Sequence, residues 1–166
     1  MRSRFLPEGR LLHTPENEAA CASRDGLRRA MEEGTVLEGV AQLCDGAHNL
    51  LVSVGPFTGF LPREEAALGI AEGTTREIAI LSRVGKPVCF QITALEESEG
   101  VLRPRLSRRR AQQAALDAML AGLHPGCILP AVVTHLESFG AFVDIGCGVP
   151  SLIGIESISV SRIPHP

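Results

Sequence analysis

One pattern occurs twice in the sequence, and this repeat limits the folds that the chain can adopt. The stretch GTVLEGVAQLCDGAHNLLVSV, residues 34–54, aligns with GCILPAVVTHLESFGAFVDI, residues 126–145, with one additional residue in the earlier turn. The stretches that follow, 55–66 and 146–157, also align, with one residue inserted in the later copy. Such a repeat predicts two copies of one supersecondary unit on either side of a connecting segment.

Each copy reads as β-structure, because short apolar runs with a period of two are separated by turn residues. The later copy has runs for three strands, at 126–136, 140–146 and about 150–155. The segment REIAILSRV, 76–84, is apolar at alternate positions, but its state stays open. The earlier copy supplies five strand candidates, enough for a small closed barrel: 34–43, 49–54, 56–62, 86–95 and 101–107.

Two other parts of the chain are expected to be helical. In residues 1–33, Thr14 and Pro15 begin one short helix, Asp25 caps a second, and the region is expected to be peripheral. Ser107 caps a longer helix that ends near Gly122. Leu116, Leu120 and Leu123 form its apolar stripe. The predicted organisation is a helical extension at 1–33, a first barrel at 34–107, a helical linker at 108–123, and the first three strands of a second barrel at 124–166.

The stretch FGAFVDIG, 139–146, contains two of the six Phe residues of a chain that has no Trp and no Tyr. Phe139 and Phe142 are three residues apart, so strict alternation would place their rings on opposite faces of a sheet. A bulge at Gly140 would bring both rings to one face, where they could stack unpaired bases. The alternative is that both rings are part of the core.

Charge limits the classes of partner. The net charge is −3, and only 107–123 carries an excess of positive charge, from Arg108, Arg109 and Arg110. These arginines either form a solvated helix face or contact phosphates. A net negative chain does not resemble a protein that holds duplex DNA mainly by neutralising phosphates. Stacking must therefore contribute much of any affinity for nucleic acid.

The chain lacks the sequence signs of a membrane or disulfide-bonded protein. No apolar run approaches the length of a membrane span, and the first residues, MRSRFLPEGR, do not form a signal peptide. Five widely spaced cysteines without a C-x-x-C pair suit reduced thiols in a cytoplasm and provide no zinc site. We expect a cytoplasmic location and no cofactor or metal.

The second copy resembles the S1 RNA-binding domain, an OB fold. The resemblance is carried by Gly126, Ile128 and Val132, by the FGAFV block at 139–143, and by the SLI block at 151–153. It covers 126–163 well and 34–110 more loosely, and the tandem arrangement resembles bacterial ribosomal protein S1. In that family the two aromatics of the FGAF block stack bases, which implies this role for Phe139 and Phe142. The family often has a histidine at the position that Gly154 occupies here.

The first copy departs further from the family pattern. His48 and Leu51 align with Phe139 and Phe142, and Pro62 replaces the family histidine. This loss favours a structural or docking role for the first copy, with Phe57 and Phe60 in the core or at its rim.

Together these features predict a mainly β, non-enzymatic protein with tandem OB barrels. It would bind single-stranded RNA in translation, with the small ribosomal subunit as a further partner, and neither membrane nor duplex DNA. The predicted RNA contacts are Phe139, Phe142, Gly140, His135, Arg108, Arg109 and Arg110.

The sequence also leaves an alternative to RNA binding open. The alternative function is a protein-interaction module that docks onto a ribosome or an RNA-processing complex. Catalysis by Cys44 with His48, or by His135 with Glu137, is disfavoured because nearby histidines more often satisfy backbone groups than activate thiols. We also expect the chain to be a fragment, because the second copy lacks the fourth and fifth strands of a barrel, leaving Val132, Val133, Ile153 and Ile155 only partly covered.

Overall fold

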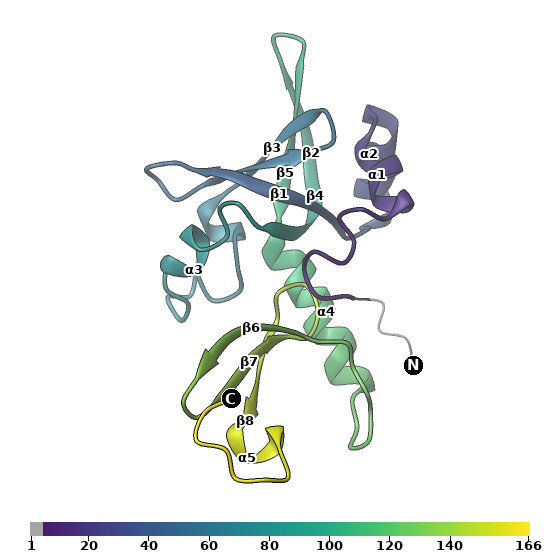
Figure 1. The fold of residues 1–166 in the computed structure, drawn as a ribbon. Coiled ribbons are helices and arrows are strands. Elements are labelled where there is room, and N and C mark those ends of the chain that lie inside the picture. Colours follow the sequence, from purple (N-terminus) through teal and green to yellow (C-terminus); the bar gives the residue numbers. More distant parts are fainter. Residues whose placement is uncertain (1–4) are drawn as a thin grey trace.

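The computed structural model describes residues 5–166 and shows a mainly β chain (Figure 1). Residues 1–4 of the expected N-terminal helical region lie outside the described residues. The strands are β1 (Leu37–Cys44), β2 (Leu50–Val54), β3 (Phe57–Leu61), β4 (Pro87–Ser98), β5 (Val101–Ser107), β6 (Val132–Glu137), β7 (Gly140–Asp144) and β8 (Pro150–Gly154). The helices are α1 (Pro15–Cys21), α2 (Arg24–Glu33), the 3-10 turn η1 (Arg63–Glu65), α3 (Ile78–Leu81), α4 (Arg108–Gly122) and α5 (Ile155–Ile158).

The first five strands close into a barrel with the order β1-β2-β3-β5-β4. Strands β3 and β5 pair in parallel, and the other pairs are antiparallel. A closed five-stranded barrel of this kind is consistent with an OB fold, and closure removes open sheet edges. All five strand candidates of the first copy are therefore confirmed.

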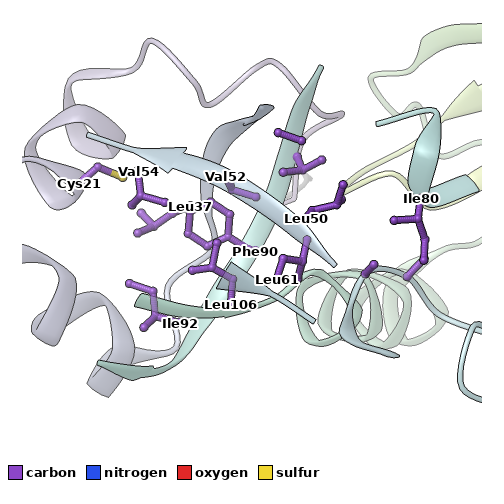
Figure 2. Packing of buried hydrophobic residues seen from close by; sticks show 14 of the residues in the cluster. Cys21, Leu37, Leu50, Val52, Val54, Leu61, Ile80, Phe90, Ile92 and Leu106 are labelled. Carbon is purple, nitrogen blue, oxygen red and sulfur yellow. The ribbon is translucent and has the colours of Figure 1, made fainter. Parts of the chain in front are cut away.

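The barrel closes around the apolar side chains that alternate along its strands. Figure 2 shows Leu50, Val52 and Val54 of β2 pointing inward toward Phe90 and Leu106. All five side chains are fully buried. Burial of such side chains stabilises a fold by about 1.5–3 kcal/mol each, so this cluster is the main stabilising element of the first half of the chain.

Helices α1 and α2 belong to this core, so the prediction that residues 1–33 are peripheral is wrong. Cys21, Leu27 and Ala30 are buried in the same cluster as the barrel residues. Thr14 caps α1 and Pro15 is its first residue, as predicted. The cap of α2 is Ser23, whose hydroxyl accepts from the N–H of Gly26, whereas Asp25 lies in the first turn of the helix.

Segment 76–84, whose state the sequence left open, contains the short helix α3. Ile80 is buried in the barrel cluster, while Ile78 and Leu81 are exposed. The alternation of apolar residues here therefore reflects one helical turn with a single buried contact rather than a strand.

Helix α4 runs from the end of β5 along the second sheet (Figure 1). Ser107 caps it as predicted, because its hydroxyl accepts from the N–H of Arg110 at 3.0 Å. The predicted leucine stripe is wrong, since Leu120 and Leu123 are exposed. The buried face consists of smaller and polar side chains, because the helix packs closely on strand β4 and on the turn after β7: Arg108, Ala111, Gln112, Ala115 and Met119.

Strands β6, β7 and β8 form a separate antiparallel sheet with β7 in the centre. Its pairing repeats that of β1, β2 and β3. The pairs Ala41–Val52 and Leu43–Leu51 of the barrel correspond to Val133–Val143 and His135–Phe142, with one unpaired residue between the pairs in each sheet. The pair Leu51–Phe60 likewise corresponds to Phe142–Leu152.

Among residues 5–166, no helix is both long and apolar enough to traverse a bilayer.

Candidate nucleic-acid interface

Three rings gather on one face of the second sheet. Phe139 lies in the turn before β7, Phe142 on β7, and His135 on the neighbouring strand β6, directly opposite Phe142. The rings of Phe139 and Phe142 meet edge to face, with centroids 6.2 Å apart at 84°. His135 stacks beside Phe142 at 6.3 Å and 30°. We call Phe139, Phe142 and His135 the ring cluster.

The ring cluster is accessible to a ligand. Phe139 is 53% exposed, His135 is exposed, and Phe142 is half-buried. The neighbours of Phe142 in the sequence, Ala141 and Val143, are buried because alternation turns them to the opposite face. The two phenyl rings are thus part of a surface and not of a core, although the sequence left both alternatives open.

The predicted bulge at Gly140 is wrong. The register shift lies on β6, between Val133 and His135, and Gly140 pairs regularly with Glu137 and with Gly154. Phe139 reaches the same face as Phe142 because it belongs to a turn and is not bound by the alternation of the strand. Gly140 has a different requirement: a Cβ there would lie 2.4 Å from the carbonyl oxygen of Ile153. It is needed where β7 and β8 approach closely.

The surface continues onto β8, which the sequence did not indicate. Leu152 is the direct partner of Phe142 and is 48% exposed. Direct partners project from the same face of a sheet, so His135, Phe142 and Leu152 form a row across three strands. Glu137 lies two residues farther along β6 than His135, and its Oε1 contacts Nε2 of His135 at 2.6 Å. An acidic side chain, Glu137, therefore lies beside the ring cluster.

Arg108 is not available to phosphates, contrary to its prediction as an RNA contact. Its side chain is buried and donates from Nε and Nη2 to the Glu8 carboxylate, at 2.6 and 2.9 Å. Its Nη1 donates to the carbonyl of Ala66. A buried guanidinium held by a bidentate carboxylate is a structural element, since separating the two would leave a buried charge without compensation.

The other two arginines of the run lie closer to solvent than Arg108. Arg109 pairs with Glu72 at 2.6 Å, with both side chains partly exposed. Arg110 is exposed at the first turn of α4. Exposed ion pairs contribute little stability, so such a pair is easily exchanged for a phosphate. Contacts of Arg109 and Arg110 with RNA stay a prediction.

Sequence reasoning missed the role of Glu8, which joins the N-terminal segment to four residues elsewhere in the chain. Besides Arg108, its carboxylate accepts from Nη1 of Arg83 at 2.9 Å and from the N–H of Cys89 at 3.0 Å. Its own N–H donates to the Asp144 carboxylate at 2.8 Å. No motif marks Glu8, because its partners are distant in the sequence.

Burial and pairing act in opposite directions on the carboxyl groups of this cluster. Burial alone would raise the pKa of Glu8, but the guanidinium of Arg108, the N–H of Cys89 and the charge of Arg83 hold that pKa below its usual value. The pKa of Asp144 is raised by burial, which outweighs the N–H groups of Glu8, Gly146 and Gly148. The first carboxyl is therefore a firmly charged partner of Arg108.

In the first barrel, the side chains at and near the turn between β1 and β2 contact an acidic residue, Glu77. His48, which aligns with Phe139, contacts Oε2 of Glu77 through Nδ1 at 2.7 Å. Glu77 also accepts from Nε of Arg63 at 2.6 Å. Pro62, which aligns with the family histidine, is buried. The ring cluster of the second sheet has no counterpart at these positions.

Of the two pairs considered for catalysis, His135 and Glu137 are in contact at 2.6 Å, whereas Cys44 and His48 each have another partner. The Cys44 thiol donates to the carbonyl of Asp45, and burial together with the Asp45 charge raises its pKa. His48 is held by Glu77 rather than by this thiol. In the part of the chain that the structure describes, no three His, Cys, Asp or Glu side chains are arranged to hold a metal ion.

Curated relatives of this chain are named small ribosomal subunit protein bS1. No family model matches the sequence. The chain is 27% identical over 146 residues to small ribosomal subunit protein bS1 of Neisseria meningitidis serogroup B, which covers 84% of this chain and 24% of that protein. It is 29% identical over 166 residues to bS1 of Mycobacterium tuberculosis, covering 96% of this chain and 32% of that protein.

A third relative, bS1 of Leuconostoc lactis, is 31% identical over 134 residues, covering 80% of this chain and 29% of that protein. The chain thus spans between a quarter and a third of the length of the curated relatives that it matches. These matches cover both the barrel and the sheet that carries the ring cluster. The chain belongs to the S1-domain proteins that resemble ribosomal protein S1.

Proposed function

We propose that the chain binds single-stranded RNA through the ring cluster of its second sheet. The observation that carries the proposal is the accessible arrangement of Phe139, Phe142 and His135 on one face, with the two phenyl rings 6.2 Å apart. Each base stacked on an aromatic side chain contributes about 1–3 kcal/mol, and stacking tolerates any base. The proposed ligand is therefore unpaired RNA without strict sequence preference.

Two features favour single strands over duplexes. Stacking on a protein ring requires that the base has left its own stack, which a duplex resists. The chain has a net charge of −3, and Arg108, one of its three consecutive arginines, is buried by Glu8. Phosphate contacts are thus few, and affinity should depend only weakly on salt.

We further propose that the barrel and the second sheet are tandem copies of one OB unit, with α4 as the linker. The matching registers of β1-β2-β3 and β6-β7-β8, including the unpaired residue at the same place, support this proposal. The bS1 relatives are named as proteins of the small ribosomal subunit. By analogy, we propose that the chain acts in translation in the cytoplasm and contacts that subunit.

A protein-docking function is the second candidate. The face of the second sheet opposite the ring cluster carries Val133, Leu136 and Ile153, which are 57%, 46% and 39% exposed. Exposed apolar side chains grouped on one face are typical of protein contacts. On this alternative, the chain would associate with ribosomal subunits through this face, and the loss of the rings would not matter.

The experiment that tests the proposed function compares one RNA sequence in two forms. Filter binding would measure affinity for an oligouridylate of about twelve nucleotides and for its duplex with oligoadenylate, each at several salt concentrations. We expect tighter binding of the single strand and a shallow dependence of log affinity on log salt. Equal affinity for the duplex, or a steep dependence on salt, would show that phosphates rather than bases are held.

A further inference from the structure

The first barrel carries a row of side chains that runs across four of its strands. Leu43 of β1 lies directly opposite Leu51 of β2, and Leu51 lies opposite Phe60 of β3. Phe60 is in turn the direct partner of Arg105 on β5, across the parallel pair. We call Leu43, Leu51, Phe60 and Arg105 the barrel row.

The barrel row lies on the outside of the barrel. Each of its members on β2, β3 and β5 alternates with a buried residue, namely Leu50, Leu61 and Leu106 (Figure 2). Leu43 is 52% exposed, and Leu51, Phe60 and Arg105 are half-buried. Phe57, on the same strand as Phe60, packs against the barrel core instead. Phe60 is therefore an aromatic side chain held at the surface.

The end of the barrel row is built from a ring and a guanidinium. The Cζ atom of Arg105 lies 5.6 Å from the centroid of the Phe60 ring. Ring and guanidinium are both flat, and bases stack on either of them. Among residues 5–166, the only ion-pair partner of this guanidinium is Glu96, at 3.2 Å in an exposed pair. Exposed pairs of this kind contribute about 0–1 kcal/mol, so a ligand can replace it at low cost.

We propose that Phe60 and Arg105 bind one unpaired base of a single-stranded nucleic acid, so that the first barrel is a second contact site for the same strand. The inference rests on the proposed function, since both sites take unpaired bases. By register, Leu51 on β2 corresponds to Phe142, and Phe60 on β3 corresponds to Leu152. The aromatic ring of the first barrel thus lies one strand farther along the sheet than the ring of Phe142. This displacement explains how a copy without the FGAF aromatics retains a stacking surface.

The charges around the barrel row favour an unpaired base over a duplex or a polyanion. Arg105 is balanced by Glu96, and the nearby turn is balanced because Glu77 holds both His48 and Arg63. A surface with paired charges attracts phosphates weakly, while Leu43, Leu51 and Phe60 offer apolar area to a base. The site should thus hold the base itself, with Arg105 adding a flat cation rather than a phosphate clamp.

Photo-crosslinking can distinguish the two sites within one experiment. An oligouridylate of about twelve nucleotides containing 4-thiouridine would be crosslinked to the full chain and digested with trypsin. Cleavage after Arg29 and Arg63 releases residues 30–63 with Phe60, and cleavage after Arg110 and Arg162 releases 111–162 with the ring cluster. We expect crosslinks in both peptides. Phe60→Leu, which keeps apolar volume but removes the ring, should lower the yield in 30–63 about fivefold or more.

Matched arginine variants separate the flat guanidinium from its charge. Arg105→Lys keeps the charge but loses the plane, and should lower the yield in 30–63 severalfold. Arg103→Lys is the control, because Arg103 lies two residues earlier on the same face of β5, is exposed, and pairs with Glu96 in the sheet register. It should leave both yields unchanged. Thermal unfolding of each variant would show that the barrel is intact.

Each outcome decides the inference. Crosslinks confined to 111–162, or an unchanged yield in 30–63 for Phe60→Leu, would overturn the second site and leave the proposed function standing. Crosslinks confined to 30–63 would support the second site and contradict the ring cluster. No crosslink in either peptide would contradict both. Loss of ribosomal-subunit association in Phe60→Leu without a change in crosslinking would overturn the inference in favour of protein docking.

Discussion

Glu8 decides more about the arrangement of the chain than any residue of the ring cluster. It brings together the N-terminal segment, Arg83 in the loop before β4, Arg108 at the start of α4, and Asp144 at the end of β7. A buried pair of this kind contributes little net stability compared with apolar residues, but removing one partner is costly. Its role is to fix the second sheet and the barrel relative to each other.

Replacement of Glu8 should therefore destabilise the chain strongly. In Glu8→Ala, the buried guanidinium of Arg108 would lose its bidentate partner, and we expect a loss of about 3–5 kcal/mol in the free energy of unfolding. Glu16→Ala is the control, because Glu16 is exposed in the first turn of α1 and should matter by about 0.5 kcal/mol. Urea denaturation measures both. A Glu8→Ala chain as stable as the control would show that Arg108 finds another partner.

Glu38 gives the chain a pH dependence near neutrality. Burial raises its pKa to about 7, although the N–H groups of Leu11, Gly9 and Leu12, which donate to Oε2, act in the opposite direction. Since the folded pKa lies above the unfolded one, the protonated carboxyl is favoured in the folded chain. This contribution is complete below the unfolded pKa near 4.5 and is lost as the pH rises through about 7.

We expect Glu38→Gln to remove this part of the pH dependence. Glutamine keeps an acceptor for the N–H groups of Leu11 and Leu12 but carries no charge. Between pH 4.5 and 8, the wild-type chain should lose about 3 kcal/mol more unfolding free energy than Glu38→Gln. Denaturation at a series of pH values measures this difference. If the unfolding free energies of the two chains changed with pH in parallel, the ionisation of Glu38 would not destabilise the folded chain.

At the scale of elements, alternation in the sequence predicted every strand of the barrel, because each strand has one buried face. Elements stabilised by distant contacts were harder to predict. Leu120 and Leu123 face solvent, since Ala111 and Ala115 are small enough for the close packing on β4. The phenylalanine spacing predicts a bulge at Gly140, whereas the register shift lies on β6, because the spacing alone does not reveal that Phe139 lies in a turn.

Gly140 should be indispensable to the second sheet for a steric reason. In Gly140→Ala, the new Cβ would lie 2.4 Å from the carbonyl oxygen of Ile153, so β8 would have to move. We expect a loss of about 1–3 kcal/mol in local stability, seen as faster amide hydrogen exchange along β7 and β8. Gly46→Ala is the control, since a Cβ at Gly46 meets no atom within 4 Å. Equal exchange rates in both variants would contradict the close approach.

At the scale of the whole molecule, the repeat in the sequence predicts two copies of one unit, and the registers of β1-β2-β3 and β6-β7-β8 match pair by pair. The placement of Phe139 and Phe142 on one face could be predicted from their residue type and spacing, and their contact with RNA stays a prediction. The role of Arg108 could not, because its charge suggested phosphate while its partner Glu8 lies 100 residues away. The similarity to bS1 of Mycobacterium tuberculosis covers 96% of this chain, so it includes both the barrel and the second sheet.

The most direct measurement of the central claim is RNA affinity in two matched double variants. Phe139→Ala with Phe142→Ala removes both phenyl rings, whereas Val133→Ala with Leu136→Ala removes exposed apolar side chains from the opposite face of the same sheet. Fluorescence anisotropy with a labelled oligouridylate of about twelve nucleotides gives the affinities. We predict a loss of about tenfold or more for the ring variant and no change for the other. Unchanged affinity without the rings, or a loss confined to the opposite face, would contradict the claim.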